Sequence, residues 1–189
     1  MKELGFRVEI FRGPDGLDAL AAGWRALVGA LERPSYVQLW EWHRAFVEAL
    51  APDPQAFHAG ALYDGEAVVA IVPLVFAAMQ VAGLRVHAAG LPRHEHVRHG
   101  DILVHPRVMG RFDLGRTLAA LRGRVGRPWD VTRLGPTMED STASAAVRAL
   151  GSRALRVTEP DGVSDALESG PYEALMDRLS KNFRGALRK

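Results

Sequence analysis

The chain has 189 residues and a mass of 20.6 kDa, and 48% of its residues are hydrophobic and 24% charged. This is the composition of one ordinary globular domain, so it excludes disorder, collagen-like repetition and a solenoid. Lysine and arginine outnumber aspartate and glutamate by only 24 to 22, so the charge balance indicates no nucleic-acid partner.

The sequence also lacks the features of proteins that depend on cysteine, span a membrane or carry a signal peptide. Cysteine is absent, which rules out disulfides, thiolate metal sites and cysteine nucleophiles. No apolar run approaches the roughly 18 residues that a membrane span needs, and the first residues lack the pattern of a signal peptide. We therefore expect a cytoplasmic protein without a membrane span.

The first third of the chain predicts one strand and two helices. Residues 6–11 alternate imperfectly and end at a glycine–proline pair, which is typical of a strand. Residues 15–31 place apolar side chains at intervals of three and four, which predicts a helix with one buried face. Ser35 and Gln38 have the spacing of a capping box and open a second predicted helix over residues 35–50.

The centre of the chain predicts an antiparallel meander. Asp64-Gly65 suits a tight hairpin turn between strands predicted over 57–63 and 66–78. The chain then returns over residues 84–88, and a further short strand is predicted over 101–105.

The rest of the chain alternates helices with strands, which favours parallel pairing. These predicted elements are a helix, a strand, a helix and a strand over 112–124, 129–134, 141–150 and 154–158. A last helix carries large apolar residues at intervals of four among basic residues: Leu175, Leu179, Phe183 and Leu187. We predict an α/β domain over residues 1–168 and a basic amphipathic linker helix over 169–189.

The middle of the chain is the electropositive part. Residues 85–133 hold ten arginines, no lysine and four acidic residues. Arginine clusters can bind phosphates or carboxylates, although a solvated arginine face explains the same pattern. The same segment contains His96, His99 and Asp101, which could bind zinc with a fourth histidine. Because these side chains alternate in direction and arginines beside them would repel a cation, we predict no metal site.

Short motifs along nearly the whole chain resemble one known family. They are Trp24-Arg25-Ala26-Leu27, Trp40-Glu41-Trp42, residues 68–74, Gly90-Leu91, residues 101–104, Trp129-Asp130-Val131 and residues 179–189. With these motifs and its element order, the chain resembles the N-terminal half of the CelD/BcsL-type proteins, which are GNAT acetyltransferases associated with cellulose biosynthesis. The resemblance implies a GNAT-like fold, a mixed sheet with an antiparallel meander in the centre and flanking helices.

The resemblance also implies an activity, the transfer of an acyl group from acetyl-CoA or another acyl-CoA to an amine or hydroxyl. The acceptor would be a small molecule or a polysaccharide precursor. In that family the second half binds acyl-CoA more clearly, so this half is expected to be substrate-side or structural rather than independently catalytic. Its partner would be a second GNAT-like half, or another copy of the chain, joined through residues 171–189. A non-catalytic dimerisation domain and a complete small acetyltransferase remain alternatives.

The family holds the CoA pyrophosphate in a loop of the form Gln/Arg-x-x-Gly-x-Gly/Ala before a helix. Arg107, Gly110 and Arg111 occupy that place here, and Phe112 stands where the last small residue belongs. A bulky side chain hinders the close approach of backbone to phosphate. The sequence therefore leaves two readings, a retained acyl-CoA site or a degenerate loop that only starts a helix.

The loop that holds the histidines is expected at the carboxyl-side cleft of the sheet, where His96 or His99 would take the proton from an amine acceptor. Asp101 matches the aspartate that precedes the fourth strand in the family, and it would orient the histidine or accept backbone hydrogen bonds. The alternative is a polar surface loop in which Asp101 caps a turn.

Overall fold

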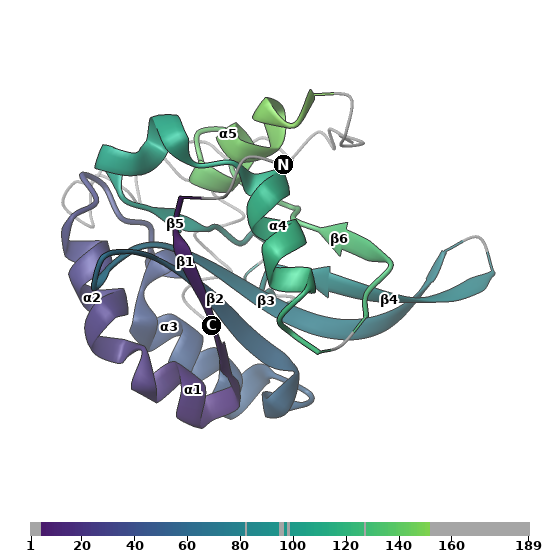
Figure 1. Ribbon diagram of the computed structural model, residues 1–189. Helices are drawn as coiled ribbons and strands as arrows, with labels where there is room; N and C mark the ends of the chain where they lie inside the picture. The colour runs from purple at the N-terminus through teal and green to yellow at the C-terminus, as the bar shows by residue number, and fades with distance from the viewer. Residues whose placement is uncertain (1–4, 82, 95–96, 98, 127, 152–189) are drawn as a thin grey trace, which may run out of the picture. The chain divides into compact units, whose positions relative to one another are not determined.

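The computed structural model describes residues 5–81, 83–94, 97, 99–126 and 128–151 (Figure 1). All of them belong to the compact unit Met1–Ala154. The strand predicted over 154–158, the domain boundary at residue 168 and the linker helix predicted over 169–189 lie outside the described residues.

A six-stranded mixed sheet forms the centre of this unit. Its main order is β1 (Arg7–Arg12), β2 (Phe57–Asp64), β3 (Ala67–Val81), β4 (Leu84–Gly90) and β6 (Val131–Arg133). The first four of these strands pair antiparallel, and β4 pairs parallel with β6. The predicted fold class, a mixed α/β sheet with an antiparallel meander in its centre and flanking helices, is confirmed.

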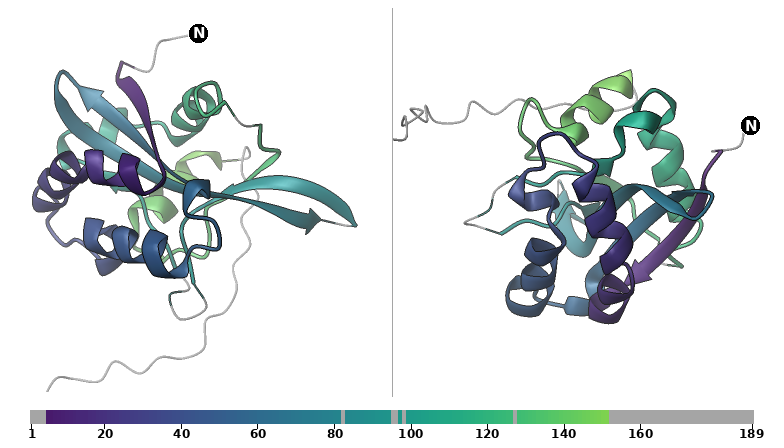
Figure 2. Two further views of the ribbon diagram at one scale, coloured as in Figure 1. Left: turned by 90° about the horizontal axis from the view of Figure 1, so that it is seen from below. Right: turned by 90° about the vertical axis from the view of Figure 1, so that its left-hand side faces the viewer.

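Helices cover both faces of the sheet (Figures 1 and 2). One face is packed under three helices, α1 (Gly13–Ala19), α2 (Ala21–Gly29) and α3 (Trp40–Ala45), and the other under α4 (Leu114–Arg122) and α5 (Thr142–Ala149). None of the helices described here is long and apolar enough to span a membrane.

Two separate hydrophobic cores follow from the alternation of side chains along the strands. On β3, Ile71 belongs to the core beneath α1 to α3, whereas Val72 belongs to the core beneath α4 and α5. On β5 (Leu103–Val104), Leu103 and Val104 divide between the two cores in the same way. Both faces of these strands are therefore buried, which explains why their sequences are apolar without alternation.

The first predicted helix is two helices. It breaks at Leu20 between α1 and α2, and because Leu20 stays buried with near-helical dihedral angles, the apolar face continues across the break.

The prediction of one helix over 35–50 is wrong. The capping box forms as predicted, with the backbone N–H of Ser35 donating to Gln38 Oε1 at 2.9 Å. It opens only a short 3-10 helix, however, and Leu39 is extended before α3 begins. The reason is tertiary: the carbonyl of Gln38 accepts the indole N–H of Trp24 at 2.8 Å, so it does not continue a helical ladder.

Strand β5 is shorter than the strand predicted over 101–105. Its residues pair with Ala70 and Ile71 of β3, on the side of β3 opposite to β2, which is also the side where β4 pairs. After Gly90 the chain therefore leaves the edge of β3 that pairs with β4, and it returns to the same edge of β3 at Leu103.

The outer parts of β3 and β4 form a two-stranded arm that projects from the sheet (Figures 1 and 2). The pairing of β2 with β3 ends at Val75, and β6 reaches β4 only at Ala88–Gly90.

Candidate functional site

The parallel strands β4 and β6 separate after Gly90 and Arg133, their last pair. The N–H of Leu91 still donates to the carbonyl of Arg133 at 3.3 Å. Beyond this pair, the segment after β4 runs toward β5 and the segment after β6 runs toward α5. Ligands of α/β sheets commonly bind where the chains beyond two neighbouring parallel strands part in this way.

A cleft of about 380 Å³ opens between these diverging segments. Three parts of the chain form its walls, the loop after α2, the segment around β5 and the residues just before α5. Val37 and Val104, each 1% exposed, form its buried part. Met109 and Met138 line it with largely exposed side chains. The cleft therefore combines an apolar interior with an open entrance.

Asp101 lines the cleft and is buried in a network of hydrogen bonds. Its Oδ1 accepts from the N–H groups of Ile102 at 2.8 Å and Ala143 at 2.6 Å. Its Oδ2 accepts from the N–H of Thr142 at 3.3 Å and from Gln38 Nε2 at 2.8 Å. The carboxylate thereby caps the N-terminus of α5 and ties it to two loops.

Two opposing effects act on the acidity of Asp101. Burial raises the pKa of its carboxyl above the ordinary value, and the backbone N–H groups of Ala143, Ile102 and Thr142 act against that rise. Because all four donors need an acceptor, Asp101 has a structural role whatever else it does. The catalytic role expected for it stays a prediction.

His99 lines the same cleft with a half-buried side chain. Its ring lies edge-on to the ring of Tyr36, with 5.6 Å between the centroids. The four hydrogen bonds of Asp101 do not include the imidazole of His99, so the structure does not join the two as a dyad. His96, the other expected proton acceptor, lies outside the described residues.

Gln38 is the site residue that sequence reasoning missed. It is 4% exposed, and its side-chain amide donates to Asp101 Oδ2 and to the carbonyl of Ile102. The sequence signal at this position was the capping box, which predicted the contact with Ser35 but not the bonds to residues 63 and 64 positions away. Gln38 holds the wall formed by the loop after α2 against the wall around β5.

The histidines weighed as zinc ligands have other environments. The backbones of His94 and Val97 pair through two hydrogen bonds, and His105 Nδ1 accepts from the N–H of Arg107 at 3.1 Å. In the part of the chain that the structure describes, no group of three histidine, aspartate or glutamate side chains could hold a metal ion.

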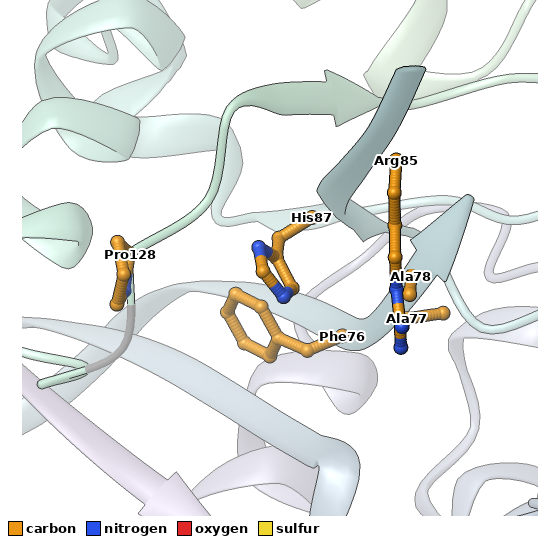
Figure 3. A pocket seen from close by; sticks show the side chains of 6 residues that line it. All are labelled: Phe76, Ala77, Ala78, Arg85, His87 and Pro128. Carbon is orange, nitrogen blue, oxygen red and sulfur yellow. The ribbon is translucent and has the colours of Figure 1, made fainter. Parts of the chain in front are cut away.

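A second, smaller groove of about 170 Å³ lies at the base of the projecting arm (Figure 3). Phe76, His87 and Pro128 lie around it, with Arg85 alongside. His87 is tied to the segment before β6, because its N–H donates to Asp130 Oδ2 at 2.8 Å. The groove is small and its histidine is exposed, so we take the larger cleft as the candidate site.

Comparison with known proteins finds likenesses among solved structures. No family model and no curated protein matches the chain. Acetyltransferases of known structure are similar to it. One is a ribosomal-protein-alanine N-acetyltransferase from Brucella melitensis biovar Abortus 2308, with 16% identity over 87% of this chain and 99% of that one and a TM-score of 0.47.

Two further similar structures are aminoglycoside acetyltransferases. AAC(6')-Iy, in complex with CoA, has 16% identity over 88% of this chain and 99% of its own, with a TM-score of 0.49. An enzyme from an uncultured soil metagenomic sample, in complex with sisomicin, has 10% identity over 86% and 97%, with a TM-score of 0.48. At these identities and TM-scores the likeness assigns no ligand to this chain, whose own residues must be tested against acyl-CoA.

A CoA pyrophosphate needs backbone N–H groups that are free to hold it. Residues Pro106–Arg111 form a 3-10 helix, in which N–H groups bond to carbonyls three residues earlier. The N–H groups at its start are also taken, because Arg107 donates to His105 Nδ1 and Val108 donates to the His105 carbonyl.

The N-terminus of α4, which follows this 3-10 helix, is occupied as well. Oδ1 of Asp113 accepts the N–H of Arg116 at 3.0 Å, so a carboxylate already stands where a phosphate would bind. A second anion there would be repelled. Several of the backbone N–H groups after β5 that could hold a pyrophosphate are therefore already bonded within the chain.

The side chains expected to bind the cofactor divide between two environments. Arg111 pairs with Asp64 at 3.1 Å and lies over the ring of Phe6. Arg107 and Gly110 are exposed, and a Cβ at Gly110 would meet nothing within 4 Å. Cofactor binding by these three residues stays a prediction that the hydrogen bonds of the backbone do not favour.

Proposed function

We propose that this chain is the acceptor-side domain of an acyl-CoA-dependent acyltransferase of the GNAT type. It forms one wall of the acceptor site and is not the part that holds the acyl-CoA. A second GNAT-like half, or another copy of the chain, joined through residues 171–189, supplies the cofactor site. The acceptor is a small molecule or a polysaccharide precursor, and the cytoplasmic location and the link to cellulose biosynthesis belong to the same proposal.

One observation carries this proposal. The cleft lies beyond the point where two parallel strands part, and the helix N-terminus that lines it, that of α5, is capped by the carboxylate of Asp101. A helix N-terminus binds a phosphate through free N–H groups and its positive dipole end, and at α5 the N–H groups of Thr142, Ala143 and Ser144 are already bonded within the chain. The cleft thus keeps room for a ligand while lacking the features that hold CoA.

Calorimetric titration of the whole chain with acetyl-CoA and with CoA tests this assignment. We expect no saturable binding at millimolar ligand. The matched variant is Gly110→Trp, which places a bulky side chain at the loop where a Cβ would meet nothing within 4 Å. Saturable binding by the natural chain that Gly110→Trp abolishes would make this chain a complete acyl-CoA site and overturn the proposal.

A different measurement distinguishes an acceptor-side domain from a non-catalytic dimerisation domain. If the chain acts only as a dimerisation domain, sedimentation will show a dimer that no acceptor-like ligand perturbs. If it builds an acceptor wall, small molecules will bind the cleft whether or not the chain is dimeric.

A further inference from the structure

Exposed apolar side chains gather at one place on the described surface. Of the six large hydrophobic side chains that are exposed among the described residues, two, Met109 and Met138, line the cleft. A third, Tyr36, is 49% exposed and contacts His99, which also lines it. Clustered apolar surface is typical of binding sites, and methionine side chains adapt to ligands of varied shape.

The uncharged polar groups of the cleft are largely engaged within the chain. Gln38 uses its amide for Asp101, Ile102 and Ser35, as described above. Ser35 Oγ accepts the N–H of Val37, and Ser141 Oγ accepts the N–H of Ser144. A sugar is recognised through many free donors and acceptors, and Gln38, the most buried of these residues, uses both N–H groups of its amide within the chain.

Two carboxylates of the cleft are free to act on a ligand. Glu32 and Asp140 line it, are exposed, and form no ion pair with any residue that the structure describes. Arg33 is the one arginine among the lining residues. With Asp101 included, the lining carries three acidic groups against one arginine and the imidazole of His99, so acidic groups outnumber basic ones and the field favours a cation.

We propose that this cleft binds an organic cation with an apolar body, an ammonium group carried on an aromatic or aliphatic frame. The ammonium lies toward Glu32 and Asp140, and the apolar body lies against Val37, Val104 and the two methionines. If the proposed function holds, this ligand is the acyl acceptor, which narrows the acceptor to a hydrophobic amine and sets aside a polysaccharide precursor.

Three small probes separate the two requirements in calorimetric or ligand-observed NMR titrations of the whole chain. Tryptamine has both the cation and the apolar body, tryptophol keeps the body and replaces the ammonium by a hydroxyl, and glucosamine keeps a cation on a polar body. We expect tryptamine to bind saturably and tryptophol to bind about tenfold more weakly, because the attraction to two carboxylates is lost. Glucosamine is expected to show no saturable binding.

Variants of exposed residues locate the site without disturbing the core. Glu32→Gln and Asp140→Asn should each weaken tryptamine about threefold and leave tryptophol unchanged, because a solvated charge pair contributes little but measurable affinity. Met138→Ser should weaken both. The matched control is Glu66→Gln, which removes a fully exposed carboxylate at the β2–β3 turn and should change neither.

Several results would overturn the inference: no saturable binding of tryptamine, glucosamine binding as tightly as tryptamine, or equal losses with Glu66→Gln and Asp140→Asn. These outcomes are independent of the acyl-CoA titration. If the chain binds both the cation and CoA, the ligand class is retained and the acceptor-side role is refuted. If the chain binds neither the cation nor CoA, only the ligand class is refuted.

Discussion

Acidification should destabilise this protein through one buried histidine, His43 of α3. Its side chain is 1% exposed and packs among aromatic rings, with centroid distances of 4.6 Å to Trp24, 4.8 Å to Trp42 and 5.9 Å to Phe57. Neither ring nitrogen has a hydrogen-bond partner among the described residues. Burial lowers the pKa of His43 from 6.5 to about 3, and the backbone of Val37 acts in the opposite direction.

The sign of the effect follows from where the proton binds. Above pH 6.5 His43 is neutral in both the folded and the unfolded chain, so it does not make stability depend on pH. Below pH 6.5 the unfolded chain takes up a proton that the folded chain does not, down to about pH 3. Each pH unit in that window lowers the free energy of unfolding by about 1.4 kcal/mol, so the loss at pH 4.5 is about 2.7 kcal/mol.

Urea unfolding at pH 7.5, 6.5, 5.5 and 4.5 measures this loss, and tryptophan fluorescence is a suitable signal because two tryptophans contact His43. The comparison is with His43→Leu, which has a similar volume and no titrating group. The natural chain should lose about 2.7 kcal/mol more than the variant between pH 7.5 and 4.5. The exposed control His87→Gln should follow the natural chain. Parallel pH profiles for the natural chain and His43→Leu would refute the reasoning.

Three further substitutions test the packing around the site, each by urea unfolding at pH 7.5. Asp101→Ala leaves buried donors of α5 and Gln38 without an acceptor and should lower stability by about 3 kcal/mol; a loss below about 1 kcal/mol would contradict the network described here. Gly60→Ala should cost about 1–3 kcal/mol, because its Cβ would clash with a methyl carbon of Leu121 in α4. Gly110→Ala, with open space around its Cβ, is the matched control and should change stability by less than about 0.5 kcal/mol.

Local patterns predicted the succession of strands and helices well. The Asp64-Gly65 turn, the strands on either side of it and the capping box at Ser35 were predicted from residues within a few positions of one another. Turn chemistry, capping and apolar periodicity act over such short distances, so a single sequence carries them. The order of elements followed in the same way.

Other features were decided only by the tertiary structure. The Gln38 carbonyl bonds to Trp24 where the predicted helix breaks, and Asp101, ahead of the short β5, bonds to the start of α5. Asp101 also bonds to Gln38, about 60 positions away, and its expected catalytic partnership with His99 stays a prediction. Buried polar groups must find partners wherever the fold brings them, and which partner a carboxylate meets depends on how whole elements pack, which no local pattern in the sequence records.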